Sequence, residues 1–184
     1  DIIKSELLTV KEKYGDDRKT SIVHSADDIR IEDLISDDPV VVTISHLNYI
    51  KRTNLSEYKR QSRGGKGSKG SEARDEDFIE HLFVATNHNY MLFFTEKGKC
   101  FWLRVFSIPE GTKTSKGRAI QNLINLEPDD KVKAFINVPT LSDEEFINNN
   151  FVILVTKKGI IKKTTLEAYS RPRQNGIIAL TIKD

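Results

Sequence analysis

The chain has 184 residues, of which 30% are charged and 38% hydrophobic, and its 29 lysines and arginines nearly balance its 27 aspartates and glutamates. This composition is typical of a globular protein with one sizeable core or two small ones. The longest apolar runs, such as 151–155, have the length of a strand and fall far below the roughly 18 residues that cross a bilayer. We therefore expect no membrane contact and, since the first residues lack a basic and then apolar export signal, a cytoplasmic location.

A helical period opens the chain, because apolar residues recur along 2–14 and Gly15 follows as a terminating residue. Acidic pairs are frequent up to residue 38. The charge then changes sign, and the segment 46–74 carries eight lysines and arginines against two glutamates. This segregation predicts a positive face that binds a polyanion and an acidic part that is turned away from it.

The remaining sequence contains one unit three times, at spacings of about 50 and then about 60 residues. The segment 50–58 matches 161–169, and a looser middle copy covers 91–104. Each copy predicts a hairpin, with a turn residue able to adopt positive φ between its two strands. These turn residues are Asn48, Gly98 and Gly159. Further strands are predicted at 79–85, 132–138 and 176–182, and Cys100 is expected to be a buried structural thiol.

These patterns favour an all-β fold of antiparallel blades arranged radially. A β-sandwich is the alternative, but it gives no reason for cations to recur at the same place in every unit. One recurring group is Lys51 and Arg52, Arg104, and Lys162 and Lys163. The other is Lys59 and Arg60, Lys116 and Arg118, and Arg171 and Arg173. Recurrence on one rim predicts a continuous positive track.

The glycine-rich stretch 61–67 is the strongest candidate for phosphate binding. It consists of Gln61, Ser62, Arg63, Gly64, Gly65, Lys66 and Gly67. Glycines let the backbone approach a sugar-phosphate chain closely, and the two cations donate to phosphate oxygens. A dinucleotide fingerprint is excluded, because charged residues replace the strand and the helix that should flank it. A solvated loop without a ligand is the alternative.

No metal site is expected in the chain. The four histidines are scattered and there is a single cysteine, whereas structural zinc needs four such ligands. Tyr58 and Tyr169 occupy matching positions of the repeat, which indicates a packing role for both tyrosines.

Four stretches together resemble the C-terminal part of the A subunit of DNA gyrase, gyrase A, a bacterial type IIA topoisomerase that introduces negative supercoils. They are 40–53, 61–67, 81–95 and 169–179. The stretch 61–67 is similar to the gyrase A box, Q-[RK]-R-G-G-[RK]-G, although Ser62 stands where the family usually has a cation.

The resemblance implies a six-bladed β-pinwheel with DNA bent around its basic rim. Residues 29–184 would form about three of the six blades, a partial pinwheel, and residues 1–20 the end of the coiled-coil dimerisation arm with its linker. Implied partners are double-stranded DNA, gyrase B and a second copy of gyrase A. ATP and Mg²⁺ would serve the parent enzyme through other domains or subunits, and this chain would hold no cofactor. It would also lack the catalytic tyrosine, which the family carries in its N-terminal domain, and would not be active alone. Two alternatives stay open, the equivalent domain of topoisomerase IV, which lacks the box, and a non-enzymatic propeller that binds proteins.

Overall fold

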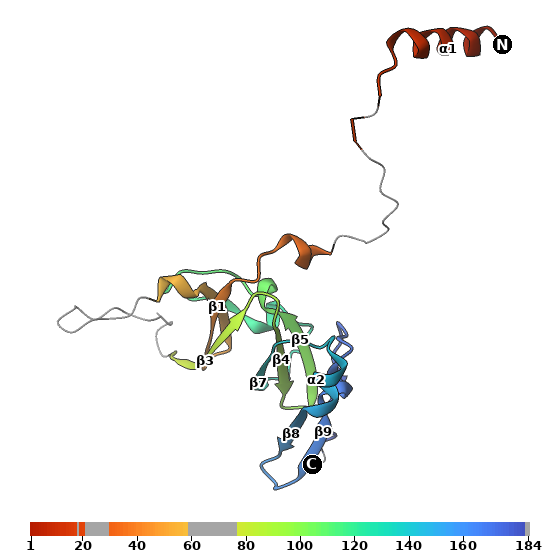
Figure 1. The fold of residues 1–184 in the computed structure, drawn as a ribbon. Coiled ribbons are helices and arrows are strands. Elements are labelled where there is room, and N and C mark those ends of the chain that lie inside the picture. Colours follow the sequence, from red (N-terminus) through yellow and green to blue (C-terminus); the bar gives the residue numbers. More distant parts are fainter. Residues whose placement is uncertain (18, 21–29, 59–76, 183–184) are drawn as a thin grey trace. The chain divides into compact units, whose positions relative to one another are not determined.

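The computed structural model describes residues 1–17, 19–20, 30–58 and 77–182 (Figure 1). Its contacts divide the chain into Asp1–Arg30, the N-terminal segment, and Ile31–Asp184, the β-domain. In the N-terminal segment, helix α1 (Ile2–Tyr14) has no buried residue. The helix ends before Gly15 as expected, but Gly15 has φ −73° and ψ 127° and is extended, not left-handed.

The described residues of the β-domain form two four-stranded antiparallel sheets and one hairpin, which we call the first, second and third blade. The first blade has the strand order β3-β1-β2-β6, with bounds Ile79–Thr86, Pro39–Ser45, Tyr49–Asn54 and Arg118–Ala119. The second has the order β7-β4-β5-β10, with bounds Val132–Val138, Tyr90–Thr95, Lys99–Arg104 and Ile177–Ile178. The third consists of β8 (Phe151–Val155) and β9 (Ile161–Thr165). The all-β partial pinwheel that the sequence predicts is thereby confirmed.

The three blades are built on one plan. The innermost pairs of their hairpins are Ile44 with Ile50, Phe94 with Cys100, and Val155 with Ile161. Each turn contains the expected residue with positive φ, at 60° for Asn48 and 81° for Gly98 and Gly159. A short 3₁₀ helix follows each second strand, and these are η2 (Leu55–Glu57), η3 (Val105–Ser107) and η5 (Leu166–Tyr169). The repeat is therefore a structural unit.

Short strands connect each repeat to the blade before it. Strand β6 follows the second hairpin in the chain but pairs with β2, and β10 follows the third hairpin but pairs with β5. A glycine with positive φ precedes each, Gly117 at 75° and Gly176 at 69°. A Cβ on these glycines would lie 2.7 Å from the Ile50 carbonyl oxygen and 2.9 Å from that of Cys100, respectively. Only glycine allows this approach without strain.

The apolar residues form two cores, each between successive blades. Strand β4 contributes to both: Met91 and Phe93 enter the first core, and Leu92 and Phe94 the second. Cys100 is fully buried in the second core, as predicted. A strand buried on both faces reads as a continuous apolar run, which explains why the middle copy shows no alternation of apolar and polar residues.

The strand predicted at 176–182 is the main error in the predicted elements, because the ladder ends at Ile178. The backbone N–H groups of Ala179 and Leu180 both donate to the Gly98 carbonyl, and the chain leaves the sheet there. Helix α2 (Glu144–Asn149) was not predicted, although Asp143 caps it by accepting from the Phe146 N–H. Two further 3₁₀ helices are η1 (Ile31–Leu34) and η4 (Ile120–Asn122).

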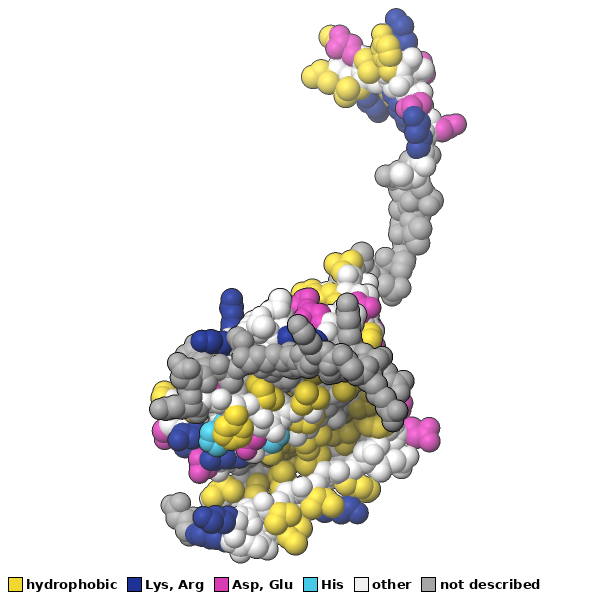
Figure 2. All heavy atoms as spheres, turned by 90° about the vertical axis from the view of Figure 1, so that its left-hand side faces the viewer, with side chains coloured by type: hydrophobic (Ala, Val, Ile, Leu, Met, Phe, Trp, Pro, Cys, Tyr) yellow, Lys and Arg dark blue, Asp and Glu magenta, His cyan; other side chains and the backbone are white. Residues whose placement is uncertain are grey.

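The third blade covers a core with one face only. Val152 and Leu154 pack into the second core, whereas Ile153, Val155 and Ile161 are exposed. Figure 2 shows hydrophobic side chains on the lower part of the β-domain, where this blade lies, and in the hollow above it. Neither described α-helix has the length and apolarity that a membrane crossing requires.

Candidate nucleic-acid interface

Several predicted phosphate contacts fall between η2 and β3 in the chain, outside the residues that the structure describes. They are Lys59, Arg60, Gln61, Arg63, Gly64, Gly65, Lys66 and Gly67. The described candidates lie on β2, β5, β6 and β9, and on two loops. We call 109–117 the first connecting loop and 170–176 the second connecting loop, since each runs from a 3₁₀ helix to a short joining strand.

Four candidates on or beside the connecting loops are exposed. They are Lys116, Arg118, Arg171 and Arg173. In the described part of the chain, none of these four side chains forms an ion pair. Because the two loops precede equivalent strands in successive blades, they repeat the same feature of the fold. They offer exposed charge that a polyanion can neutralise.

Lys51 and Arg52, in contrast, point into the protein. The Lys51 side chain lies under the first connecting loop with only 3% of the residue exposed, and its Nζ contacts loop carbonyls. Arg52 donates from Nε to the Ile108 carbonyl at 2.9 Å and pairs through Nη2 with Glu110 at 3.1 Å. The two residues support the loop from inside the blade.

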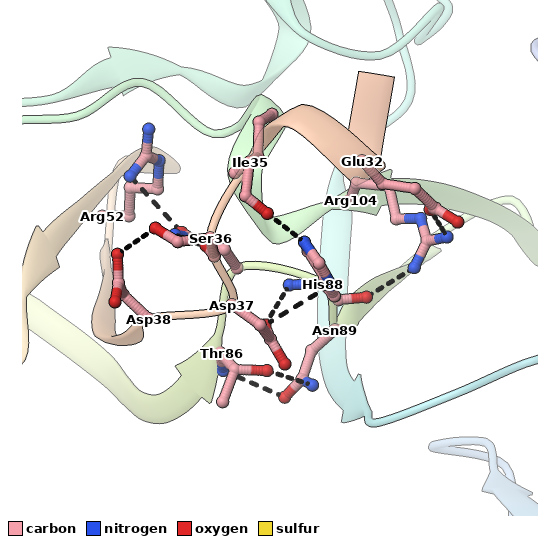
Figure 3. A network of polar contacts seen from close by, with 11 residues as sticks. Glu32, Ile35, Ser36, Asp37, Asp38, Arg52, Thr86, His88, Asn89 and Arg104 are labelled. Carbon is pink, nitrogen blue, oxygen red and sulfur yellow. Dashed lines mark hydrogen bonds and ion pairs between the residues drawn. The ribbon is translucent and has the colours of Figure 1, made fainter. Parts of the chain in front are cut away.

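Arg104 is held by a segment that precedes the first strand, residues 31–38, which we call the strap (Figure 3). Its guanidinium forms an ion pair with Glu32, donates to the His88 carbonyl and lies 3.9 Å above the centre of the Tyr90 ring. The guanidinium of Arg104 is thus stacked on a ring, and its charge and N–H donors already have partners within the protein.

The strap has further anchors on the turn between β3 and β4. The Asn87 amide donates to the Ser36 carbonyl at 2.9 Å, and His88 Nε2 donates to that of Ile35 at 2.7 Å. Burial raises the pKa of Asp37, but the hydrogen bond from the His88 N–H and the contacts with Thr86, His88 and Arg104 outweigh it. The net pKa of Asp37 therefore lies below its ordinary value.

The cations of the third blade lie on β9. Lys162 is exposed as a residue and its Nζ donates to the Ala179 carbonyl at 2.6 Å. Lys163 is exposed, with its ammonium 3.9 Å from the centre of the Phe151 ring. Lys162 and Lys163 occupy the positions that correspond to Lys51 and Arg52 in the first blade, where the first connecting loop covers the lysine.

The strand registers correct one part of the predicted recurrence. Ile50, Cys100 and Ile161 are equivalent, so Phe101 and Trp102 take the places of Lys51 and Arg52 in the second blade. Arg104 pairs with Tyr90, as Asn54 pairs with Val40, and is thus offset from the other cations. The prediction was wrong for Arg104, because the second strand of this blade carries Phe101 and Trp102 at the two equivalent places and reaches its cation two residues later.

Other lysines of the second blade are neutralised within the chain. Lys97 contacts Glu127 at 3.1 Å and Asp129 at 2.6 Å, and Lys99 contacts Glu127 at 2.6 Å. Hydrogen bonds from Lys99 and Lys97 lower the pKa of Glu127, and those to Asp129 and Glu127 raise the pKa of Lys97. The hairpin turn of the second blade is therefore less available to phosphates than the second connecting loop, which leads into the same sheet.

Two residues that belong to or support the first connecting loop were not predicted. Lys113 lies on the first connecting loop with its ammonium 4.7 Å from the centre of the Tyr58 ring. Thr53 is fully buried and its hydroxyl donates to the Gly111 carbonyl at 2.9 Å. Lys113 could have been found, because the sequence 112–117 is basic and ends in glycine as the stretch 61–67 does.

Comparison with known proteins agrees with this architecture. The family described as DNA gyrase C-terminal domain, beta-propeller, matches 39–86, 89–139 and 150–184, and these segments begin at or near the first strands of the three hairpins. The gyrase A protein of Clostridium acetobutylicum is 43% identical over 183 residues, which are 100% of this chain and 21% of that relative. The chain thus spans about a fifth of the length of this relative.

Two solved structures have the same fold. The C-terminal domain of a DNA topoisomerase IV matches with a TM-score of 0.65 and 25% identity, over 82% of this chain and 44% of that one. A DNA gyrase A C-terminal domain matches with a TM-score of 0.60 and 24% identity, over 80% of this chain and 45% of that one. On the family match and the 43% identity, this chain belongs to the DNA gyrase C-terminal domain family.

Proposed function

We propose that the β-domain binds duplex DNA and bends it along the rim formed by its connecting loops. The observation that carries this proposal is the pair of equivalent loops, each with two exposed cations on it or at its end that form no ion pair among the described residues. Arginines and lysines that neutralise phosphates release counterions, and this release supplies most of the affinity for DNA of any sequence. We therefore expect weak sequence preference.

The contacts would extend over successive blades. Lys116 and Arg118 would bind at the first connecting loop, Arg171 and Arg173 at the second, and Lys162 and Lys163 on β9. The glycine-rich stretch would contribute Arg63 and Lys66. Bending a short duplex by tens of degrees costs about 1–6 kcal/mol, which several phosphate contacts offset.

In the parent protein, this bend would present a DNA segment for strand passage in one handedness, so that a type II topoisomerase of the gyrase type introduces negative supercoils. The partners would be gyrase B and a second copy of gyrase A, in the cytoplasm, with ATP and Mg²⁺ used by other domains or subunits. Residues 1–20 would end the dimerisation arm. Helix α1 supports this assignment, because Ile2, Ile3, Leu7 and Leu8 are exposed and require a partner surface.

A competing assignment is the equivalent domain of topoisomerase IV, whose fold matches as well. The stretch 61–67 favours gyrase, because it carries Arg63, Lys66 and the three glycines of the gyrase A box. The identity of 43% to a gyrase A protein favours the same assignment. A protein-binding propeller is the remaining alternative, and it predicts no affinity for DNA.

Fluorescence anisotropy with a labelled duplex at several salt concentrations tests the proposal. We expect the logarithm of the binding constant to fall steeply with the logarithm of the salt concentration. The slope of this plot should become shallower by up to about 0.9 per lost phosphate contact in Lys116→Ala/Arg118→Ala and in Arg171→Ala/Arg173→Ala. Arg63→Ala/Lys66→Ala tests the glycine-rich stretch in the same way. The control is Lys157→Ala/Lys158→Ala, which removes the same charge from the turn of the third blade. No binding at low salt, or equal losses in the control, would refute the proposal.

A further inference from the structure

Lys51 places a charge beneath the first connecting loop. Its Nζ donates to the carbonyl oxygens of Thr112 at 3.0 Å, Lys113 at 2.6 Å and Ser115 at 2.7 Å. An ammonium group has three N–H donors, and burying it is costly unless these donors are satisfied. The loop supplies three acceptors to one lysine, so the charge fixes the path of residues 112–115.

The first part of the same loop is tied to β2 by the neighbours of Lys51. The Arg52 N–H donates to the Pro109 carbonyl at 3.0 Å, and the Gly111 N–H donates to the Arg52 carbonyl at 2.9 Å. The Thr53 hydroxyl adds its bond to Gly111. These contacts hold the beginning of the loop, and Gly117 holds its end against Ile50. Lys51 holds the middle.

The loop fixed in this way carries or precedes one half-buried cation, Lys113, and two exposed ones, Lys116 and Arg118. Lys113 and Lys116 belong to it, and Arg118 begins the strand that follows. A loop with a fixed path presents its cations with less conformational entropy to lose when phosphates bind. Lys51 itself lies underneath and is separated from solvent by the carbonyls that it binds.

The second blade shows that this arrangement is not required by the fold. Phe101 occupies the equivalent place there, and a Cβ on Gly176 of the second connecting loop would lie 2.9 Å from its ring. The second loop packs on an apolar ring and is shorter by two residues, with seven at 170–176 against nine at 109–117. The longer loop of the first blade needs polar anchoring, and Lys51 supplies it.

We propose that Lys51 is a positioning residue for DNA binding, which orders the first connecting loop so that Lys113, Lys116 and Arg118 face phosphates together. The role in DNA binding rests on the proposed function, whereas the ordering of the first connecting loop concerns the free protein. Lys51 was predicted to touch phosphate directly, and the two roles make different predictions.

Hydrogen exchange of the free chain tests the ordering role without DNA. In Lys51→Met, which keeps the apolar stem and removes the ammonium, amides of 111–117 should exchange about tenfold faster or more, the effect of losing bonds to a charged group. Thr53→Val should have a smaller effect on the same amides. Lys162→Met, at the equivalent place of the third blade, should leave them unchanged. Unchanged exchange in Lys51→Met with a folded β-domain would overturn the proposal.

A double-mutant cycle with duplex DNA then separates positioning from contact. Lys51→Met should weaken binding several-fold in the unsubstituted chain and add little in the Lys113→Ala/Lys116→Ala/Arg118→Ala background. An equal loss in both backgrounds would mean that Lys51 acts independently of the loop, and would overturn the proposal. If the unsubstituted chain binds no DNA, the proposed function fails with the DNA-binding part of this proposal, and hydrogen exchange alone decides the ordering role.

Discussion

The indole Nε1 of Trp102 in the second blade donates a 3.0 Å hydrogen bond to the carbonyl oxygen of Tyr169, which ends η5 behind the third blade. Both residues lie in the second core, where the Tyr169 ring meets Phe94 edge-on at 5.7 Å between ring centres. This bond links two successive blades at a buried position. It also gives Tyr169 the packing role that its place in the repeat predicts.

Trp102→Phe should therefore lower the free energy of unfolding by about 1–3 kcal/mol, because the Tyr169 carbonyl loses its donor in a buried place. Chemical denaturation measures the change. Tyr14→Phe serves as the control, since Tyr14 is exposed on α1 and its loss should be neutral. Equal stability of the Trp102→Phe and unsubstituted chains would show that the interblade bond contributes nothing.

Substitution of three glycines separates backbone strain from close approach. Gly159→Ala should cost about 1–2 kcal/mol, because its φ is positive and nothing lies within 4 Å of the new Cβ. Gly117→Ala and Gly176→Ala should cost more, since the Cβ would also meet the Ile50 or the Cys100 carbonyl. Denaturant midpoints of the three variants test this order. If Gly159→Ala is the most destabilised of the three, the close approach to a carbonyl does not add to the backbone strain.

The strap should lose one of its anchors, the contact between Asp37 and the His88 N–H, as pH falls. The folded-state pKa of Asp37 is depressed, so its contribution is present above the unfolded value of about 3.9 and is lost as pH falls through the folded value. The pH dependence of the His88 amide resonance, whose N–H donates to Asp37, reports this step. Asp37→Asn removes the titrating group, and a variant that keeps the same pH dependence would contradict the assignment.

The thiol of Cys100 should be inert in the native protein. Burial raises the pKa of Cys100, and the thiolate is the reactive form. We expect a thiol reagent to label Cys100 only after denaturation. Rapid labelling of the native chain at neutral pH would mean that the second core opens readily.

The repeats and most strands could be predicted from the sequence, because turn residues such as Asn48 and Gly159 mark the hairpins locally. The pairing of β6 with β2 and of β10 with β5 could not, since each joins segments 68 to 79 residues apart through only two residue pairs. The site was predictable in composition but not in detail. The pattern of charges in the sequence identifies the cations. Only the tertiary structure shows that Lys51 is hydrogen-bonded to loop carbonyls and that Arg104 is paired with Glu32.

The proposed bending of DNA can be measured by energy transfer between dyes on the two ends of a duplex of about 30 base pairs. At saturating protein, energy transfer should rise with the unsubstituted chain and with Lys157→Ala/Lys158→Ala. It should rise much less in Lys116→Ala/Arg118→Ala/Arg171→Ala/Arg173→Ala, even when that variant is saturated at lower salt. Tight binding without any rise in transfer would show that the β-domain does not bend DNA, and an equal rise in the fourfold variant would show that the connecting loops do not cause the bend.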